Sequence, residues 1–356
     1  MISLKREKGI VGLDIGSYAI KAVELTAKKK NEFEVESIGY ELLPRDAIVE
    51  GTIMDSEAVA GTIKMIFDEN KISNKSVSIS ISGTSVIIKK ISLPAMESEE
   101  LAESIIWEAK HNIPYPYEET NVDYTIMKPP ADSAEKNLDI LLVAAKKDKI
   151  ANYSSVVDQA RKSLRAIEVD VFALQNAMEV NYPEIAQEKT AAIVNLGANI
   201  TNLIIIEKGT PQLFRDLSLG GFLFIENMRK ELGISFDDAE KTLKGLPAQD
   251  TAPEQIQAVL TTSVENLLSE IEKTFSFFRA GEQKESKIDQ IFLSGGLSSL
   301  KDLPLFFEQR FKIKTELFNP FNSISFNEKK LDSIYFQEMA SSFGVATGLA
   351  TRKAEK

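Results

Sequence analysis

The feature that most constrains the fold is an internal repeat at half the length of the chain. The segment around Asp14, LDIGSYAIKAVEL, resembles the segment around Asn195, VNLGANITNLIII, and the offset between the two residues is 195 − 14 = 181. The other aligned pairs are Gly16 with Gly197, Ser17 with Ala198, and Val23 with Ile204. A repeat at about half of 356 residues predicts two related lobes, each presenting a glycine hairpin to a shared cleft.

Each hairpin consists of two apolar strands joined by a tight glycine turn. Such a turn lets backbone N–H groups converge on an anion, which makes a phosphate-binding site. In the first hairpin Ser17 adds a hydroxyl donor, and Lys21 is either a phosphate ligand or a surface lysine. Asp14 stands at the end of its strand and suits a Mg²⁺ ion held through water, because Mg²⁺ loses its waters reluctantly.

Two glycine pairs add to this pattern. Gly220-Gly221 and Gly295-Gly296 each follow an apolar segment and offer surfaces without side chains. A purine or a ribose can lie closely against such a surface. Each pair alone is most simply an ordinary turn. In one ordered set with the two hairpins, the pairs predict a nucleotide site.

The composition excludes several other kinds of protein. A formal net charge of −11 argues against a nucleic-acid partner, because a phosphate backbone needs a basic surface. The chain has no cysteine and a single histidine, His111, which argues against thiolate metal sites, disulfides and histidine-based catalysis. No apolar run approaches the roughly 18 residues of a membrane helix, and no signal-peptide pattern precedes the first strand. We therefore expect a cytoplasmic protein.

Strand-like and amphipathic helical segments alternate along the chain, which predicts a mixed α/β fold. Residues 85–144 follow a βαββ pattern and interrupt the first half. Their aromatic residues, Trp107, Tyr115 and Tyr117, could form either the core of this insertion or a partner-binding surface. The predicted boundaries are a first lobe at 1–84 and 145–189, an inserted subdomain at 85–144, a second lobe at 190–217 and 286–356, and a helical subdomain at 218–285.

Local patterns give further expectations. Ser56 is the expected N-cap of a helix at 56–70. The alternation in SVSISIS predicts a half-buried strand. The three phenylalanines at 275, 277 and 278 are expected in the core of a long helix, and turn-rich loops are predicted at 128–136 and 245–255.

These motifs resemble, in order and over the whole chain, those of the actin-like ATPases, the superfamily of actin, sugar kinases, FtsA and MreB. GLDIGSYAIK resembles the first phosphate motif, NLGANIT the second, and FLSGGLSSL the adenosine motif. DAEKTLK resembles the ribose-binding segment A-E-x-x-K, although Glu240 and Lys244 are four residues apart here instead of three. The resemblance implies an α/β, actin-like ATPase fold of duplicated ribonuclease-H-like lobes with an FtsA-type inserted subdomain.

The same resemblance implies that ATP and Mg²⁺ are the cofactors. The residues it assigns to the nucleotide are Asp14 (through Mg²⁺-bound water), Gly16, Ser17, Tyr18, Lys21, Asn195, Gly197, Ala198, Asn199, Gly220, Gly221, Glu240, Lys244, Gly295, Gly296 and Leu297.

A narrower resemblance is to the PilM family of type IV pilus assembly. The inserted block VIIKKISLPAM…ELAESIIWEAKHNIPYPYEETNVDY carries it, together with VDVFALQNA and LFNPF. The resemblance implies a cytoplasmic ATP-binding scaffold at the inner membrane, which binds the cytoplasmic N-terminus of the membrane protein PilN. PilO and PilP would be indirect partners, self-association stays open, and a related role in type II secretion is an alternative.

Two departures from the superfamily bear on catalysis. Asn195 stands where the second phosphate motif normally has aspartate, and an amide brings no charge and cannot act as a base. Where MreB-like ATPases carry the glutamate of E-P-x-A-A, this chain has Ala173 and Leu174, and only Gln175 is nearby to orient a water molecule. We therefore expect tight nucleotide binding with slow or absent turnover, and no confidently assigned catalytic residue.

Three other functions compete with the scaffold. A superfamily kinase would need a carboxylate base near its acceptor hydroxyl. An FtsA-like division or filament protein would need an amphipathic C-terminal helix, which the tail after Gly348 lacks. A chaperone would need a further peptide-binding domain, for which the chain is too short.

Overall fold

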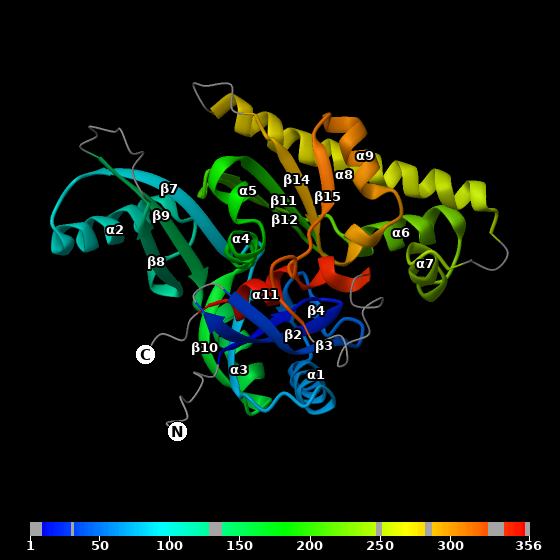
Figure 1. Cartoon of the computed structure of the whole chain (residues 1–356), viewed down its shortest axis with the longest axis horizontal. Coiled ribbons are helices and arrows are strands. Elements are labelled where there is room, and N and C mark those ends of the chain that lie inside the picture. Colours follow the sequence, from blue (N-terminus) through cyan, green and yellow to red (C-terminus); the bar gives the residue numbers. More distant parts are fainter. Residues whose placement is uncertain are drawn as a thin grey trace.

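The computed structural model describes residues 9–29, 32–127, 137–246, 251–281, 287–326 and 338–352. The loop predicted at 128–136 and part of the loop predicted at 245–255 lie outside these ranges. Two α/β lobes face each other, with a small subdomain beside them at one end and a helical subdomain at the other (Figure 1).

A mixed sheet with the strand order β10-β6-β1-β2-β3 forms the centre of the first lobe. The chain makes an antiparallel meander through β1, β2 and β3, and β6 and β10 then add in parallel next to β1. The elements of this lobe are β1 (Val11–Ile15), β2 (Ala19–Lys29), β3 (Glu32–Leu42), β4 (Ile48–Val49), β5 (Thr52–Ile53), α1 (Ser56–Glu69), β6 (Ser76–Ile81), α3 (Lys147–Gln159) and β10 (Ser163–Val169).

The second lobe repeats this plan. Its sheet has the order β13-β12-β11-β14-β15, with an antiparallel meander followed by two parallel strands. The elements in and around this sheet are α4 (Asp170–Asn181), α5 (Pro183–Glu188), β11 (Thr190–Leu196), β12 (Thr201–Glu207), β13 (Thr210–Leu217), β14 (Gln290–Ser294), η2 (Gly296–Ser299), α9 (Leu303–Phe311), β15 (Lys314–Leu317), η3 (Ala340–Phe343) and α11 (Gly344–Ala350). The sequence repeat is thus a repeat of topology.

The inserted subdomain is a three-stranded antiparallel sheet with one helix, in the predicted βαββ order. It consists of β7 (Val86–Pro94), α2 (Ser98–Asn112), the 3₁₀ turn η1 (Tyr117–Glu119), β8 (Thr120–Ile126) and β9 (Asn137–Lys146). Tyr115 and Tyr117 pack against its core, whereas Trp107 is 58% exposed on α2. His111 stacks on Trp107 with the ring centres 4.0 Å apart.

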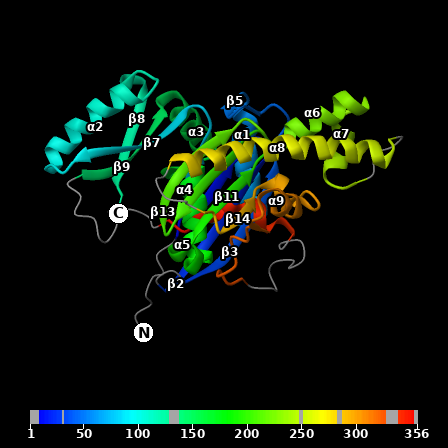
Figure 2. The same cartoon turned by 90° about the horizontal axis from the view of Figure 1, so that it is seen from above.

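Three helices form the subdomain at the other end: α6 (Gly221–Leu232), α7 (Phe236–Leu243) and α8 (Pro253–Gly281). The long helix α8 runs along one side of the second sheet, as Figure 2 shows from above. Gly233 ends α6 in a left-handed conformation, and the Ser235 hydroxyl caps α7 by accepting from the N–H of Asp238.

Helices α4 and α11 cross between the lobes, and their packing requires close backbone contact. Every residue of α11 is buried, and this helix packs against β1 and α4. A Cβ atom on Gly348 would lie 1.7 Å from the carbonyl oxygen of Ala173, and one on Gly12 would lie 1.9 Å from that of Ala346. Glycine at these two positions therefore lets α11 fit between the lobes.

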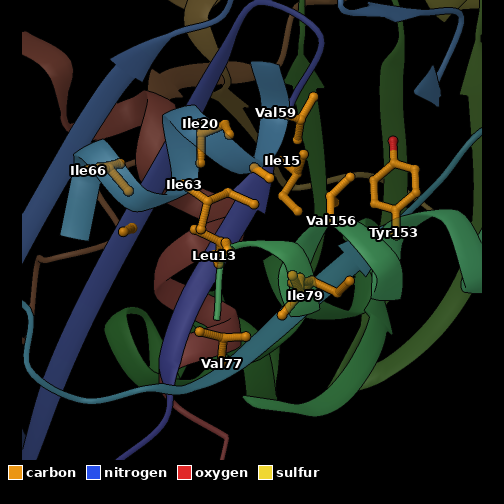
Figure 3. Packing of buried hydrophobic residues seen from close by; sticks show 14 of the residues in the cluster. Leu13, Ile15, Ile20, Val59, Ile63, Ile66, Val77, Ile79, Tyr153 and Val156 are labelled. Atoms are coloured by element: carbon orange, nitrogen blue, oxygen red, sulfur yellow. The ribbon is translucent and has the colours of Figure 1, made fainter. Parts of the chain in front are cut away.

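Apolar side chains fill the space between the first sheet and its helices α1 and α3 (Figure 3). Leu13, Ile15 and Ile20 of the first hairpin meet residues of both helices in this cluster. The contacting helix residues labelled in the figure are Val59, Ile63, Ile66, Tyr153 and Val156. Burial of this kind stabilises a fold by about 25 cal/mol per Å² of apolar surface. The hairpin that carries Asp14 is therefore held on a well-packed core.

The structure corrects three local predictions. Asp55, not Ser56, caps α1, because its side chain accepts from the N–H of Ala58 at 2.9 Å. The strand β6 is buried on both faces, because it lies between β1 and β10 in a sheet covered on both sides. Phe277 is 67% exposed, because only the phenylalanines three residues apart in α8 face the core.

Candidate functional site

A cavity of about 670 Å³ lies between the two lobes and meets the helical subdomain. Fifteen of the sixteen nucleotide residues assigned from the sequence line it. They are Asp14, Gly16, Ser17, Tyr18, Lys21, Asn195, Gly197, Ala198, Asn199, Gly221, Glu240, Lys244, Gly295, Gly296 and Leu297. The two hairpins of the repeat thus open into one cavity.

In the first hairpin Asp14 and Lys21 face each other across β1 and β2 and form an ion pair, with Nζ 3.1 Å from Oδ2. Burial lowers the pKa of Lys21, but the Asp14 carboxylate, together with Tyr40 and Asp170, outweighs burial and leaves the pKa of this lysine raised. Lys21 is therefore charged and inside the cavity, and the alternative of a surface lysine is wrong.

The second hairpin places an amide pair where the first has this ion pair. Asn195 and Asn202 face each other across β11 and β12, and the Asn195 amide donates to Oδ1 of Asn202 at 3.1 Å. Asn202 in turn donates to the Asp216 carboxylate at 2.8 Å. The amide nitrogen of Asn195 is thereby engaged, and its oxygen is the atom that could accept from a metal-bound water.

Two glycines allow close backbone contacts at and beside the cavity. Gly295 has φ of +86°, and a Cβ atom there would lie 2.4 Å from the Leu196 carbonyl oxygen, so only glycine fits. Gly220 is the one predicted residue of the set that does not line the cavity. A Cβ atom on it would meet the Ala198 carbonyl at 2.4 Å, and its role is to let α6 begin against the second hairpin.

Side chains from the first lobe and the helical subdomain meet at the mouth of the cavity. The Tyr18 hydroxyl donates to Oε1 of Glu240 at 2.5 Å, and Lys244 Nζ lies 2.6 Å from the Tyr18 oxygen and 2.7 Å from the Glu240 carboxylate. Beside them Arg45 pairs with Asp237 and lies over the ring of Phe236. These contacts join the first lobe to helix α7. The four-residue spacing of Glu240 and Lys244 brings both side chains to the cavity, one helical turn apart.

The inner end of the cavity contains a residue that the sequence analysis missed. Asp170, the first residue of α4, lines the cavity together with Lys149 and Tyr153. Burial raises the pKa of Asp170 to about 6, and the Asp14 carboxylate adds to this shift, while hydroxyl groups of Ser80 and Ser82 oppose it. Asp170 is thus a carboxyl group that can exchange a proton near neutral pH.

A signal for Asp170 was present in the sequence. In E-P-x-A-A the carboxylate comes three residues before the first alanine, and Asp170 comes three before Ala173. Gln175, the predicted water-orienting residue, does not line the cavity. Its amide nitrogen lies 2.9 Å from the Glu179 carboxylate and 3.3 Å from the Gly209 carbonyl, so the water-orienting role assigned to it lacks support.

The chemistry of these residues fits a magnesium nucleotide. Glycine turns bring backbone N–H groups to the cavity, Lys21 supplies a buried positive charge, and Glu240 and Lys244 supply polar groups at its mouth. Within the described residues no group of three or more acidic or histidine side chains could enclose a metal ion. A Mg²⁺ ion would therefore be held by Asp14 through water and by phosphate oxygens.

Comparison with solved structures defines the class of protein. The chain has 12% identity and a TM-score of 0.58 with the ethanolamine utilization protein EutJ from Carboxydothermus hydrogenoformans, over 96% of this chain and 89% of that one. With MreB5 of Spiroplasma citri bound to ADP, it has 14% identity and a TM-score of 0.54, over 97% and 95% of the two chains. The fold is that of the actin-like ATPases.

A family model assigns the chain to a narrower group than the fold does. The family model for the type IV pilus assembly protein PilM matches residues 12–354, so the chain belongs to the PilM family. A solved structure of a PilM–PilN type IV pilus biogenesis complex has a TM-score of 0.87 and 24% identity, and covers 98% of this chain and 99% of that one. Among the described residues, no helix combines the length and apolar character needed to cross a bilayer.

Proposed function

We propose that this protein is a cytoplasmic scaffold of type IV pilus assembly that binds Mg·ATP between its lobes and the N-terminus of PilN at the inner membrane. One observation carries the nucleotide part: two hairpins 181 residues apart open into a single cavity, with a partly buried Asp14–Lys21 pair in one and Asn195 in the other. The actin-like fold supports the same assignment, since a solved relative, MreB5, is bound to ADP.

Calorimetric titration with Mg·ATP tests the nucleotide site. Asp14→Ala removes the carboxylate that would hold Mg²⁺ through water and also leaves Lys21 unpaired, so we expect at least tenfold weaker binding. Asp158→Asn, on the exposed end of α3, is the matched control and should bind as the parent does. Equal affinity in the Asp14→Ala variant and the parent would refute the site.

The partner assignment rests on the family and on the inserted subdomain, which the PilM–PilN complex matches along with the rest of the chain. We propose that PilN binds in a groove between this subdomain and the first lobe and links the scaffold to PilO and PilP. The test is a pull-down from cell membranes with ATP present, using the parent and Asp14→Ala. Recovery of PilN by the parent alone supports a nucleotide-dependent scaffold, and failure to recover PilN with the parent refutes the partner.

We further propose that ATP turnover is slow. Asn195 brings no negative charge to the phosphate site, and Asp170 is a cavity carboxyl whose raised pKa suits it to accept a proton from water. Phosphate release at saturating Mg·ATP should therefore be slow in the parent and lower still in Asp170→Asn. Several turnovers per minute by the purified monomer, or full activity of Asp170→Asn, would contradict this.

A further inference from the structure

A four-residue junction, Ser82 to Ser85, connects β6 of the first lobe to β7 of the inserted subdomain. Each of its residues has a contact outside the junction. Ser82 lines the cavity, where its hydroxyl acts on the Asp170 carboxyl. The Gly83 N–H donates to Oδ2 of Asp216 in the second lobe at 2.6 Å.

The other two contacts come from the inserted subdomain. The Thr84 carbonyl accepts from the Tyr115 hydroxyl at 2.6 Å, and the Ser85 carbonyl accepts from the Lys146 N–H at 3.0 Å, where strand β9 returns to the first lobe. Gly83 has φ of +86°, a conformation that other residues adopt at a cost. The junction is therefore a defined turn between three bodies.

A continuous chain of hydrogen bonds joins this turn to the second phosphate hairpin. Asn195 donates to Asn202, Asn202 donates to Asp216, and Asp216 accepts the Gly83 N–H on its other oxygen. Both asparagines line the cavity, while Asp216 and Gly83 do not. A ligand that hydrogen-bonds to the Asn195 side chain therefore acts on the same series of hydrogen bonds that positions the start of the inserted subdomain.

From this arrangement we propose that the Asn195–Asn202–Asp216–Gly83 chain couples nucleotide occupancy of the cavity to the orientation of the inserted subdomain. The proposal rests on the proposed function, because it takes a magnesium nucleotide as the ligand, and adds how that ligand would regulate the partner site. Ligand binding in the cavity changes the position of the two lobes relative to each other at this turn. Strand β7 moves with the turn because the N–H of its first residue, Val86, donates to the Gly83 carbonyl at 2.9 Å.

Asp216→Asn interrupts this series of hydrogen bonds with little change in the shape of the side chain. A carboxylate accepts from two donors, whereas an asparagine side chain has one oxygen and would present an NH₂ group to a second donor. Asp216 is exposed, so the variant should fold. Asp289→Asn is the matched control, because Asp289 also accepts a backbone N–H, that of Thr190 at 2.9 Å, elsewhere in the same lobe.

The absence of cysteine in the sequence allows a direct distance measurement. Spin labels at Ala102→Cys on α2 and Asp158→Cys on α3, both exposed, would report the position of the inserted subdomain relative to the first lobe. We expect saturating Mg·AMP-PNP to shift the distance distribution in the parent and in Asp289→Asn. The shift should be lost in Asp216→Asn and reduced in Tyr115→Phe, which removes the bond to Thr84.

Calorimetry on the same proteins separates the nucleotide site from its coupling to the inserted subdomain. A parent that binds Mg·AMP-PNP without any shift, or an Asp216→Asn variant that shifts as the parent does, overturns the coupling but leaves the nucleotide site standing. A parent that does not bind Mg·AMP-PNP overturns both. With a synthetic peptide of the cognate PilN N-terminus, nucleotide should change the peptide affinity at least about fivefold in the parent, and the ratio should approach one in Asp216→Asn.

Discussion

Asp14 and Asn195 show how one repeated position can carry different chemistry. Each faces a partner on the neighbouring strand seven residues later, Lys21 in the first lobe and Asn202 in the second. The first lobe therefore has a buried ion pair and the second a neutral amide pair. The difference concentrates charge on one side of the cavity, where a metal–phosphate group needs a cation and a carboxylate.

Removal of one member of the ion pair should cost more than removal of both. Asp14→Asn leaves the buried Lys21 without its counter-charge, and we expect a loss of about 3 kcal/mol in the free energy of unfolding. Adding Lys21→Met should restore a large part of this loss. Urea unfolding of the two single variants and the double variant tests it, and strictly additive losses would show that the pair is not coupled.

The raised pKa of Asp170 should make the stability of the protein depend on pH. Its pKa of about 6 in the folded protein exceeds the ordinary 3.8, so its contribution to stability falls as pH rises from about 4 to 6 and stays low above that. Asp170→Asn removes the buried charge and should stabilise the protein by about 2 to 3 kcal/mol at pH 7.5.

The comparison is made by urea unfolding at two pH values. Near pH 4.5 the gain in the free energy of unfolding from Asp170→Asn should be much smaller, because the Asp170 carboxyl of the parent is then protonated. Asp158→Asn, at an exposed position, should give the same small difference at both pH values. An advantage for Asp170→Asn that does not change with pH would contradict the assignment.

At the scale of elements, two glycines in helices have opposite roles. Gly348 lies in α11 against the Ala173 carbonyl, while nothing lies within 4 Å of a Cβ atom placed on Gly61 in α1. The first glycine permits contact between two helices, and the second only weakens its own helix.

Alanine substitution should therefore change stability in opposite directions. Gly348→Ala forces α11 away from α4 and should cost about 3 kcal/mol or more, as overpacking does at a tight contact. Gly61→Ala should stabilise the protein by about 0.5 to 1 kcal/mol, because alanine favours a helix. Thermal unfolding of both variants measures this. Equal effects would show that the contact at Gly348 relaxes without cost.

At the scale of the whole molecule, the bridge of Tyr18, Glu240 and Lys244 is one of the contacts that join the first lobe to the helical subdomain beside the cavity. Opening of the cavity must break it. Its strength should therefore affect how fast a bound nucleotide leaves.

Tyr18→Phe should speed that release. Loss of the hydroxyl removes a bridge worth about 1 kcal/mol, so the dissociation rate of a fluorescent ATP analogue in stopped flow should rise about fivefold. Tyr182→Phe is the control, because this hydroxyl bonds the Asn319 N–H away from the cavity. An unchanged rate in Tyr18→Phe would mean that another contact limits opening.

Sequence patterns alone predicted the duplicated fold, the βαββ insertion and fifteen residues of the cavity. They could do so because glycine turns between apolar strands, and their repetition, are local patterns along the chain. Asp170 was overlooked although its position matches the carboxylate of E-P-x-A-A, and its raised pKa comes from burial and from Asp14, which is distant in sequence. Asp216 leaves no local pattern, because its hydrogen bond is to Gly83 in the other half of the chain. Such burial and contacts across two lobes depend on how the whole chain packs, so the sequence alone does not reveal them.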